Sequence, residues 1–376
     1  MSGLRIAFFG SSLVSAYWNG AATYYRGIIR ALADRGHHVT FYEPDMHDRQ
    51  AHRDIENPEW ARMMVYAAEE SALERALEDA KDCDLLVKTS GVGKFDDLLE
   101  AAVLDMRSPH TIAAFWDVNA PATLERLHAN RDDPFHALIP RYDLILTYGG
   151  GARVVEAYAR LGARACVPIY NALDPKTHHP VRMEPRFGAD LGLLANRLPD
   201  REERVEKFFL RAAKEAPGRK FLLGGSGWQD KAVPPNVKVL GHVFTWDHNA
   251  FNSSVRAVLN VNRESMAAHG SSPPTRIFEA AGAAACIISD AWEGIDFFLE
   301  PGREVLVAEG GLEVASLLLG LTAPRARKIG AAAYRRVMAR HTYKHRVAQL
   351  EEVLGVGHRH AMVASGLQVS GAALAG

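Results

Sequence analysis

Short apolar runs alternate with helical patterns along most of the chain. In the first half, helical spacing places Tyr24, Ile28 and Leu32 on one face, and further helices are expected at about Glu59–Ala80, Phe95–Met106 and Ala120–His128. The apolar runs between them have the length and composition of buried strands. They are Leu4–Phe9, His38–Tyr42, Asp84–Thr89, Thr111–Trp116, Asp143–Thr147 and Arg164–Ile169. This alternation predicts βαβ units and a parallel sheet.

The same alternation restarts after a connector rich in Asn, Asp and Pro, which runs from Tyr170 to Pro180. The strands expected in the second half are Ala189–Ala195, Phe221–Leu223, Val237–Val243, Ala257–Asn262 and Cys286–Ser289. The expected helices are Asp200–Ala216, Asn249–Ser254, Thr275–Gly282, Leu312–Leu321, Arg325–Arg340 and one more to Leu354. We therefore expect one domain over 1–170 and a second over 171–340, with a poorly ordered tail over 357–376.

Length and composition agree with two globular domains. The chain has 376 residues, of which 48% are hydrophobic and 24% charged. Lys and Arg number 44 and Asp and Glu 45, so a net charge of -1 argues against a general nucleic-acid binder. The N-terminus does not have the organisation of a signal peptide, and no apolar run reaches 18 residues. These features indicate a cytoplasmic enzyme of bacterial type.

Several common site motifs are missing or misplaced. The first βα unit has no G-x-G-x-x-G, which disfavours a nicotinamide enzyme. Cys83, Cys166 and Cys286 are too sparse for a disulfide framework or zinc site. Cys166 and Cys286 border predicted strands, so we expect these two to be buried thiols. Asp82-Cys83-Asp84 matches a metal-binding D-x-D, but it precedes its strand and is interpreted as a solvated loop. No metal site is predicted.

The most informative stretch is SSPPTRIFEAAGAAACIISDAWEGIDFFLEPGREVLV, which runs from Ser271 to Val307. Two prolines precede a helix that begins at Thr275, and Arg276 and Glu279 project from one side of its first turns. They form either a surface ion pair or a nucleotide clamp. In the clamp, helix-start N–H groups and Arg276 hold phosphate while Glu279 accepts the ribose hydroxyls. Asp290 ends the next strand, where open α/β sheets place ligands.

This stretch resembles the donor-binding signature of GT-B glycosyltransferases, and most closely that of the CgeB-like (spore maturation protein) branch. The resemblance implies an α/β fold with two Rossmann-like domains facing a central cleft, and a final helix at about 341–356 that returns to the first domain. It implies transfer of a hexose-type sugar from a nucleotide diphosphate donor to an acceptor. Arginines and a helix N-terminus would stabilise the departing diphosphate, so that no metal or other cofactor is needed.

The resemblance also implies donor contacts from several segments. Arg197 would neutralise the diphosphate, the loop at Asn19-Gly20 would approach the donor phosphates or the acceptor, and backbone near Val243 would meet the nucleotide base. Glycines near Ser226 would make room for a ligand. The complete set of implied donor-binding positions is Asn19, Gly20, Arg197, Gly225, Ser226, His242, Val243, His269, Ser271, Thr275, Arg276 and Glu279.

One position departs from the family pattern. Retaining relatives carry Glu-x7-Glu, and counting back from Glu279 places Ser271 at the first acidic position. A serine does not supply the same charge against the donor sugar. Retention and inversion of the anomeric centre therefore both stay open.

Asp117 is the candidate general base of the first domain, because it stands at the ligand end of a strand. A second interpretation is that its carboxylate caps the following turn. The sequence does not choose between the two.

The segment Arg325–Arg346 contains many basic residues and no acidic one. It is interpreted either as a solvated or docking face, or as a peripheral contact with the inner membrane that would suit a lipid-linked acceptor. The acceptor itself, whether glycan, protein, lipid or small molecule, is not indicated.

Two other functions remain open at this stage. One is a nucleotide-sugar epimerase or phosphorylase on the same fold, although no phosphorylase cofactor lysine or phosphate pocket is evident. The other is a non-catalytic sugar-nucleotide binding protein, which Ser271 and the uncertain base would suit. The choice among UDP, GDP and dTDP, the sugar and the oligomeric state are not indicated.

Overall fold

The computed structural model describes residues 3–16, 21–262 and 270–356. Its contacts divide the chain into unit 1, which contains 1–170 and 343–376, and unit 2, which contains 171–342. The predicted tail over 357–376 lies outside the described residues, as do Asn19, Gly20 and His269. No helix among the described residues is both long and apolar enough to cross a membrane.

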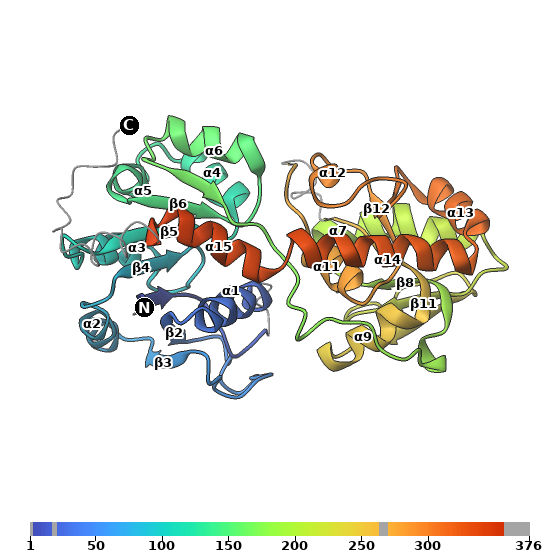
Figure 1. The fold of residues 1–376 in the computed structure, drawn as a ribbon, viewed down its shortest axis with the longest axis horizontal. Helices are drawn as coiled ribbons and strands as arrows, with labels where there is room; N and C mark the ends of the chain where they lie inside the picture. The colour runs from blue at the N-terminus through green and yellow to red at the C-terminus, as the bar shows by residue number, and fades with distance from the viewer. Residues whose placement is uncertain (1–2, 17–20, 263–269, 357–376) are drawn as a thin grey trace. The chain divides into compact units, whose positions relative to one another are not determined.

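Unit 1 is a parallel sheet covered by helices (Figure 1). The described strands have the order β3-β2-β1-β4-β5-β6-β7. They are β1 (Arg5–Phe9), β2 (His38–Asp45), β3 (Arg62–Ala67), β4 (Leu85–Thr89), β5 (Ile112–Asp117), β6 (Leu144–Thr147) and β7 (Cys166–Pro168). The helices are α1 (Ala22–Asp34), α2 (Glu70–Asp79), α3 (Asp96–Asp105), α4 (Ala120–Ala129), α5 (Phe135–Leu138), α6 (Gly151–Arg160) and α15 (Tyr343–Val353).

The central strands of unit 1 are apolar on both faces, and this explains the helices on both sides. Phe9 of β1 stacks on Tyr42 with ring centroids 4.6 Å apart, while its neighbour Phe8 stacks on Phe41 at 5.4 Å. Successive residues of a strand point to opposite faces, so these two pairs lie on opposite sides of the sheet. Burial on both faces is typical of parallel sheets.

One element of unit 1 was predicted wrongly. The pattern from Glu59 to Ala80 was interpreted as one long helix, but it contains the edge strand β3 followed by the shorter helix α2. β3 pairs in parallel with β2, with Met63 opposite Phe41 and Met64 opposite Tyr42. This pairing outweighs the helix preference of Met and Ala, because propensity is weak beside tertiary contacts.

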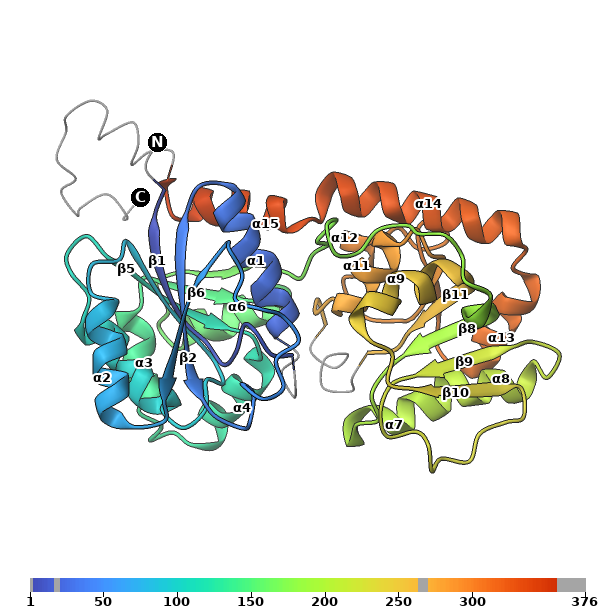
Figure 2. The ribbon, with the colours of Figure 1, turned by 90° about the horizontal axis from the view of Figure 1, so that it is seen from below.

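The C-terminal helix α15 packs on α1 within unit 1 (Figure 2), as the sequence predicted. A methyl group added at Gly27 of α1 would meet the Tyr343 ring at 2.1 Å, so the glycine permits this approach. Glu351 accepts hydrogen bonds from Arg35 and His37, and Arg346 donates to the Tyr170 carbonyl at 3.1 Å. Both ends of α15 are therefore attached to unit 1.

Unit 2 is a second parallel sheet, with described strands in the order β10-β9-β8-β11-β12-β13. The strands are β8 (Ala189–Leu194), β9 (Phe221–Gly224), β10 (Val237–Gly241), β11 (Val255–Asn260), β12 (Ile287–Asp290) and β13 (Leu306–Ala308). The helices are α7 (Pro199–Val205), α8 (Arg211–Glu215), α9 (Thr245–Ser254), α11 (Thr275–Gly282), α12 (Ile295–Phe298), α13 (Gly311–Gly320) and α14 (Ala323–Arg340). A π-helical turn at Glu206–Leu210 joins α7 to α8.

Both sheets reverse their strand order once, between β1 and β4 in unit 1 and between β8 and β11 in unit 2. In open α/β sheets, ligands bind outside the carboxyl ends of the strands near such a reversal. This rule directs attention to the residues that follow β8, β11 and β12.

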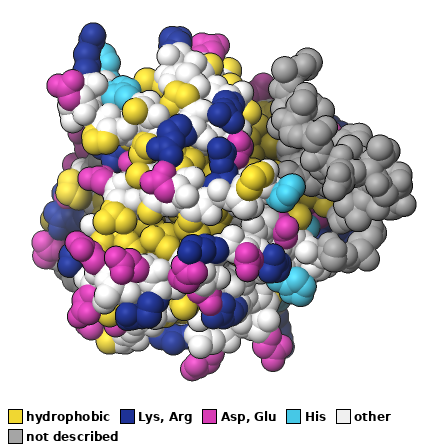
Figure 3. Space-filling view, turned by 90° about the vertical axis from the view of Figure 1, so that its left-hand side faces the viewer, with side chains coloured by type: hydrophobic (Ala, Val, Ile, Leu, Met, Phe, Trp, Pro, Cys, Tyr) yellow, Lys and Arg dark blue, Asp and Glu magenta, His cyan; other side chains and the backbone are white. Residues whose placement is uncertain are grey.

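The surface carries charges of both signs. Figure 3 shows one face on which basic and acidic side chains are interspersed around apolar patches. Of the two cysteines expected to be buried, Cys286 is buried, whereas Cys166 is partly exposed because it lies on the edge strand β7. The three cysteines are free thiols, and burial raises the pKa of Cys286 and Cys166 to about 12. Cys83 lies in the turn before β4, and the D-x-D around it precedes that strand.

Candidate functional site

The carboxyl ends of β11 and β12 carry a buried polar cluster. Asp290 is fully buried and accepts a hydrogen bond from Arg204 at 2.6 Å and from the Asn262 backbone N–H at 3.2 Å. Asn260 donates from its amide to the Ser289 hydroxyl at 3.0 Å. Burial raises the pKa of the Asp290 carboxyl, and the Arg204 guanidinium opposes this rise. Asp290 is thus an internal anchor for α7 and for the end of β11.

Helix α11 begins beside this cluster. Pro274 precedes it, and no side chain in the described part of the chain caps its first N–H groups. The Arg276 side chain is half-buried, and its Nη1 lies 3.5 Å from the Asn260 amide oxygen. Burial lowers the pKa of Arg276, while the Glu279 and Asp290 carboxylates act in the opposite direction. A cation and unshared backbone donors therefore occur at one end of this helix, which is the arrangement that binds anions.

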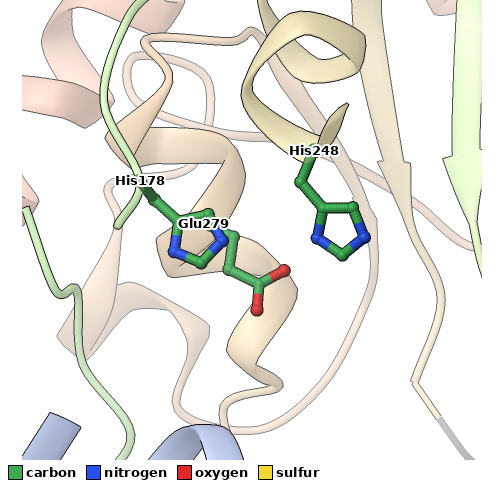
Figure 4. Close-up of side chains that lie close together, drawn as sticks. All are labelled: His178, His248 and Glu279. Atoms are coloured by element: carbon green, nitrogen blue, oxygen red, sulfur yellow. The ribbon is translucent and has the colours of Figure 1, made fainter. Parts of the chain in front are cut away.

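Glu279 lies one turn further along α11. Among the described ion pairs none joins Arg276 to Glu279, so the surface ion pair considered from the sequence is not formed. Glu279 instead lies close to His178 and His248, which come from two other segments of unit 2 (Figure 4). In the sequence, His178 is part of the connector between the two predicted domains, and neither histidine was a predicted site residue. No spacing motif links the three residues, so only the fold reveals them as neighbours.

Arg197 follows β8, but carboxylates already surround it. Glu202 accepts two hydrogen bonds from its guanidinium, at 2.7 and 2.8 Å, and Asp230 accepts another at 3.0 Å. The hydrogen bond with Glu202 raises the pKa of Arg197 and, with help from Lys231, lowers the pKa of Glu202 to about 2. Binding a diphosphate would require Arg197 to exchange these partners.

The glycine-rich segment after β9 packs against its own sheet. Gly225 has a φ of 130°, and an added methyl group would lie 2.0 Å from the Ala195 carbonyl oxygen. The Ser226 backbone N–H donates to the Asn196 side chain at 3.0 Å. Contact with the end of β8 therefore explains the glycine, and the space expected there for a ligand is filled by backbone.

The residues expected near the nucleotide base follow β10. His242 is exposed, and its ring meets Phe244 edge-on at 4.6 Å. The Val243 carbonyl accepts a hydrogen bond from His248 Nε2 at 3.2 Å. One of the two backbone groups of Val243 is therefore already engaged within unit 2.

Ser271 adopts an unusual backbone conformation next to a carboxylate that the sequence analysis missed. Its φ is 38°, and its N–H donates to the Glu293 carbonyl at 2.6 Å. A methyl group added at the neighbouring Gly270 would lie 3.0 Å from a Glu293 carboxylate oxygen. Glu293 is exposed. An acidic group thus lies near the position at which the family pattern has glutamate, although it comes from the loop after β12.

In unit 1, Asp117 ends β5 and is fully buried. Its carboxylate accepts hydrogen bonds from Tyr158 at 2.6 Å, Ser90 at 2.8 Å and the Asn119 backbone N–H at 2.9 Å. The last of these is a turn-capping bond of the kind that the sequence analysis had considered. This geometry favours the capping interpretation of Asp117.

Residues 201–352 match the family described as glycosyl transferase-like. No curated protein matches the chain. Among solved structures, sucrose-phosphate synthase from Thermosynechococcus elongatus is 16% identical with a TM-score of 0.65, covering 96% of this chain and 100% of that chain.

Two further structures cover 94% of this chain and 100% of their own. Anabaena HepE in complex with UDP and glucose is 14% identical with a TM-score of 0.66. An alpha-glucosyltransferase in complex with UDP-glucose and DNA is 11% identical with a TM-score of 0.70. At these identities the likeness shows the fold alone, and that fold is GT-B.

Proposed function

We propose that the protein is a glycosyltransferase that takes a sugar from a nucleotide diphosphate donor held by unit 2. The observation that carries the proposal is the start of α11, where uncapped N–H groups lie beside the half-buried Arg276. This helix lies within the segment that matches the glycosyl transferase-like family. UDP is the proposed nucleotide, because it is named for the HepE and alpha-glucosyltransferase structures.

Each group at α11 has a role that fits its chemistry. Backbone N–H groups at Thr275 and Arg276, with the partial positive charge of the helix N-terminus, would bind the diphosphate. The Arg276 guanidinium would stabilise the charge that develops on the leaving diphosphate. Glu279 would accept hydrogen bonds from the ribose hydroxyls. Arg276 suits the diphosphate better than Arg197 does, because Arg197 would first have to leave Glu202 and Asp230.

Because these groups supply positive charge at the diphosphate, the proposed chemistry does not require a cation there. Asp117 is assigned to capping, since its carboxylate already accepts three hydrogen bonds. Ser271 stands at the acidic position of the family pattern and carries no charge. The Glu293 carboxylate is therefore the proposed acidic group near the donor sugar. It is exposed and adjacent to Gly270.

The experiment is a thermal-shift screen of UDP, GDP, dTDP and their sugars, followed by kinetics with the donor that binds. A ligand at about 100 times its Kd should stabilise the protein by about 2.7 kcal/mol. Arg276→Ala should lower kcat/KM by roughly 10- to 150-fold, because hydrogen bonds to charged groups contribute about 1.5–3 kcal/mol. Arg325→Ala, at an exposed position of α14, is the control and should leave the kinetics unchanged. Equal kinetics for both variants would remove Arg276 from the site.

A second candidate is a non-catalytic sugar-nucleotide binding protein, and Ser271 in place of an acidic residue favours it. Both candidate functions require binding of the sugar nucleotide, but only the glycosyltransferase turns it over. Release of nucleotide from the best-binding donor, measured with and without candidate acceptors, separates them. Binding with no release would favour the second candidate.

A further inference from the structure

Three potential ligand groups converge in unit 2 from separate segments. His178 lies in the connector, His248 lies on α9 and Glu279 lies on α11. One ligand atom from each lies within 4.8 Å of the other two. In the view of Figure 4, the Glu279 carboxylate is seen between the two imidazole rings.

The backbone on both sides of His178 is attached to α9. The Asn249 amide donates to the Thr177 carbonyl at 2.9 Å, and its oxygen accepts from the His179 backbone N–H at 3.3 Å. Asn249 is next to His248, so these hydrogen bonds fix the connector around His178 to the part of α9 that carries His248. Their ring centroids lie 6.4 Å apart, and the ring planes form an angle of 28°.

Helix α11 also packs closely against the connector. A methyl group added at Gly282 would lie 2.9 Å from the His178 carbonyl oxygen and 2.4 Å from a Leu173 methyl group. Glycine is therefore required for the connector to reach α11. This approach brings the Glu279 carboxylate, one turn earlier, beside the two imidazoles.

Each imidazole has one nitrogen for which the described residues offer no hydrogen-bond partner. These atoms are Nε2 of His178, a residue that is 4% exposed, and Nδ1 of His248. A carbonyl can only accept, so the contact from His248 Nε2 to Val243 requires the proton to be on Nε2 in the neutral ring. Nδ1 of His248 then carries a lone pair. A buried lone pair beside a carboxylate gathers negative potential, which favours a cation at this point.

We propose that His178, His248 and Glu279 bind a divalent transition-metal ion of the zinc class. Two imidazoles and one carboxylate form a ligand set that zinc uses in sites with an open fourth position, whereas Mg²⁺ and Ca²⁺ prefer oxygen ligands. The Val243 carbonyl supplies the outer hydrogen bond that usually orients a ligating histidine. Zinc ligands at about 2.0–2.1 Å in a tetrahedron lie roughly 3.3 Å apart, so the side chains close inward by an ångström or more on binding.

The metal site and the proposed donor site share only Glu279. A carboxylate has two oxygens, so one can bind the metal while the other accepts a hydrogen bond from a hydroxyl group. Metal binding is measured without any nucleotide, and nucleotide binding is measured on Arg276 variants. Failure of one proposal is therefore distinguishable from failure of the other.

The experiment is a titration of the full-length, chelator-treated protein with Zn²⁺ alone by calorimetry, and with Co²⁺ alone by visible absorption. We expect one ion per chain and the intense bands of tetrahedral Co²⁺. His178→Phe and His248→Gln should each weaken binding by roughly 100-fold or more, because each removes a direct ligand. His179→Ala is the matched control, since this neighbouring histidine is exposed and should be dispensable.

A variant that restores a ligand separates metal binding from a packing role. Cysteine is a zinc ligand and phenylalanine is not, so His178→Cys should bind zinc and shift the cobalt spectrum toward sulfur ligation. Circular dichroism establishes that each variant is folded. The proposal is overturned if the wild-type protein binds neither ion, if His178→Phe binds like the wild type, or if His179→Ala abolishes binding.

Discussion

Replacing Arg204 by Met tests whether the buried ion pair at the end of β12 holds unit 2 together. The Asp290 carboxylate has no exposure, the Arg204 side chain is 15% exposed, and their closest atoms are 2.6 Å apart. Methionine keeps much of the volume of the arginine stem but removes the charge. Asp290 would then retain only uncharged donors such as the Asn262 backbone N–H. Removing one partner of a buried pair costs about 3–5 kcal/mol.

The pH dependence of this loss identifies its cause. Burial raises the pKa of Asp290, and Arg204 limits that rise, so the variant should have a still higher folded-state pKa. A group whose pKa is raised by folding stabilises the folded state fully below its unfolded pKa and loses that contribution as the pH rises through its folded pKa. The difference between wild type and variant should therefore be large at pH 7 and shrink toward about pH 4.

Thermal unfolding followed by circular dichroism measures this difference. The expected loss corresponds to a decrease in Tm of roughly 6–20 °C for a unit of this size. Arg211→Met is the matched control, because Arg211 is paired with Glu215 on the exposed surface of α8 and should cost at most about 0.5 kcal/mol. A loss that is equal for both variants, or that is the same at pH 4 and pH 7, would refute the electrostatic argument.

Three shorter predictions concern unit 1. Gly27→Ala should detach α15, because the new methyl group would overlap the Tyr343 ring; faster proteolysis of the C-terminal segment would report it. Glu351→Gln should cost up to about 1 kcal/mol at pH 7. Burial alone would raise the pKa of Glu351, but Arg35 and His37 lower it, so this stability is present above the unfolded pKa and disappears as the pH falls. Tyr158→Phe should cost about 1.5–3 kcal/mol in urea unfolding, because the phenol donates to the Asp117 carboxylate, and should leave kcat unchanged if Asp117 only caps its turn.

The fold could largely be predicted from the sequence, because local patterns and long-range pairing agree at most elements. Strands such as β1 and β12 are continuous apolar runs, and a parallel sheet buried on both faces produces this pattern. The edge strand β3 could not be predicted in this way. Met63 and Tyr66 have no strand-like alternation, and only pairing with β2 makes their segment extended. The π-helical turn at Glu206–Leu210 was also not visible in the helical pattern.

From the sequence, only those residues of the candidate site that lie on one continuous segment could be predicted to lie together. Arg276 and Glu279 lie on a single helix after two prolines, so their spacing alone placed them together. His178 and His248 are far apart in the sequence, and the contact of Gly282 with the connector brings them near Glu279. Glu293 approaches Gly270 through the turn of the loop after β12, which no local pattern encodes. Partners such as Glu202 for Arg197 are similarly apparent only in the folded chain.

The charges at the strand ends of unit 2 explain why Arg276, and not Arg204, is the candidate to bind an anion. Asp290 is the fully buried carboxylate there, and its ion pair is with Arg204. Among the described residues, Arg276 has no carboxylate oxygen within ion-pair distance. Burial lowers its pKa, so the charged form is less favourable in the folded chain than in water. An anion bound at the start of α11 would supply the missing counter-charge, and its own charge would be met by backbone N–H groups. Anion binding should therefore stabilise the wild-type protein more than Arg276→Ala, even when the anion is inorganic pyrophosphate.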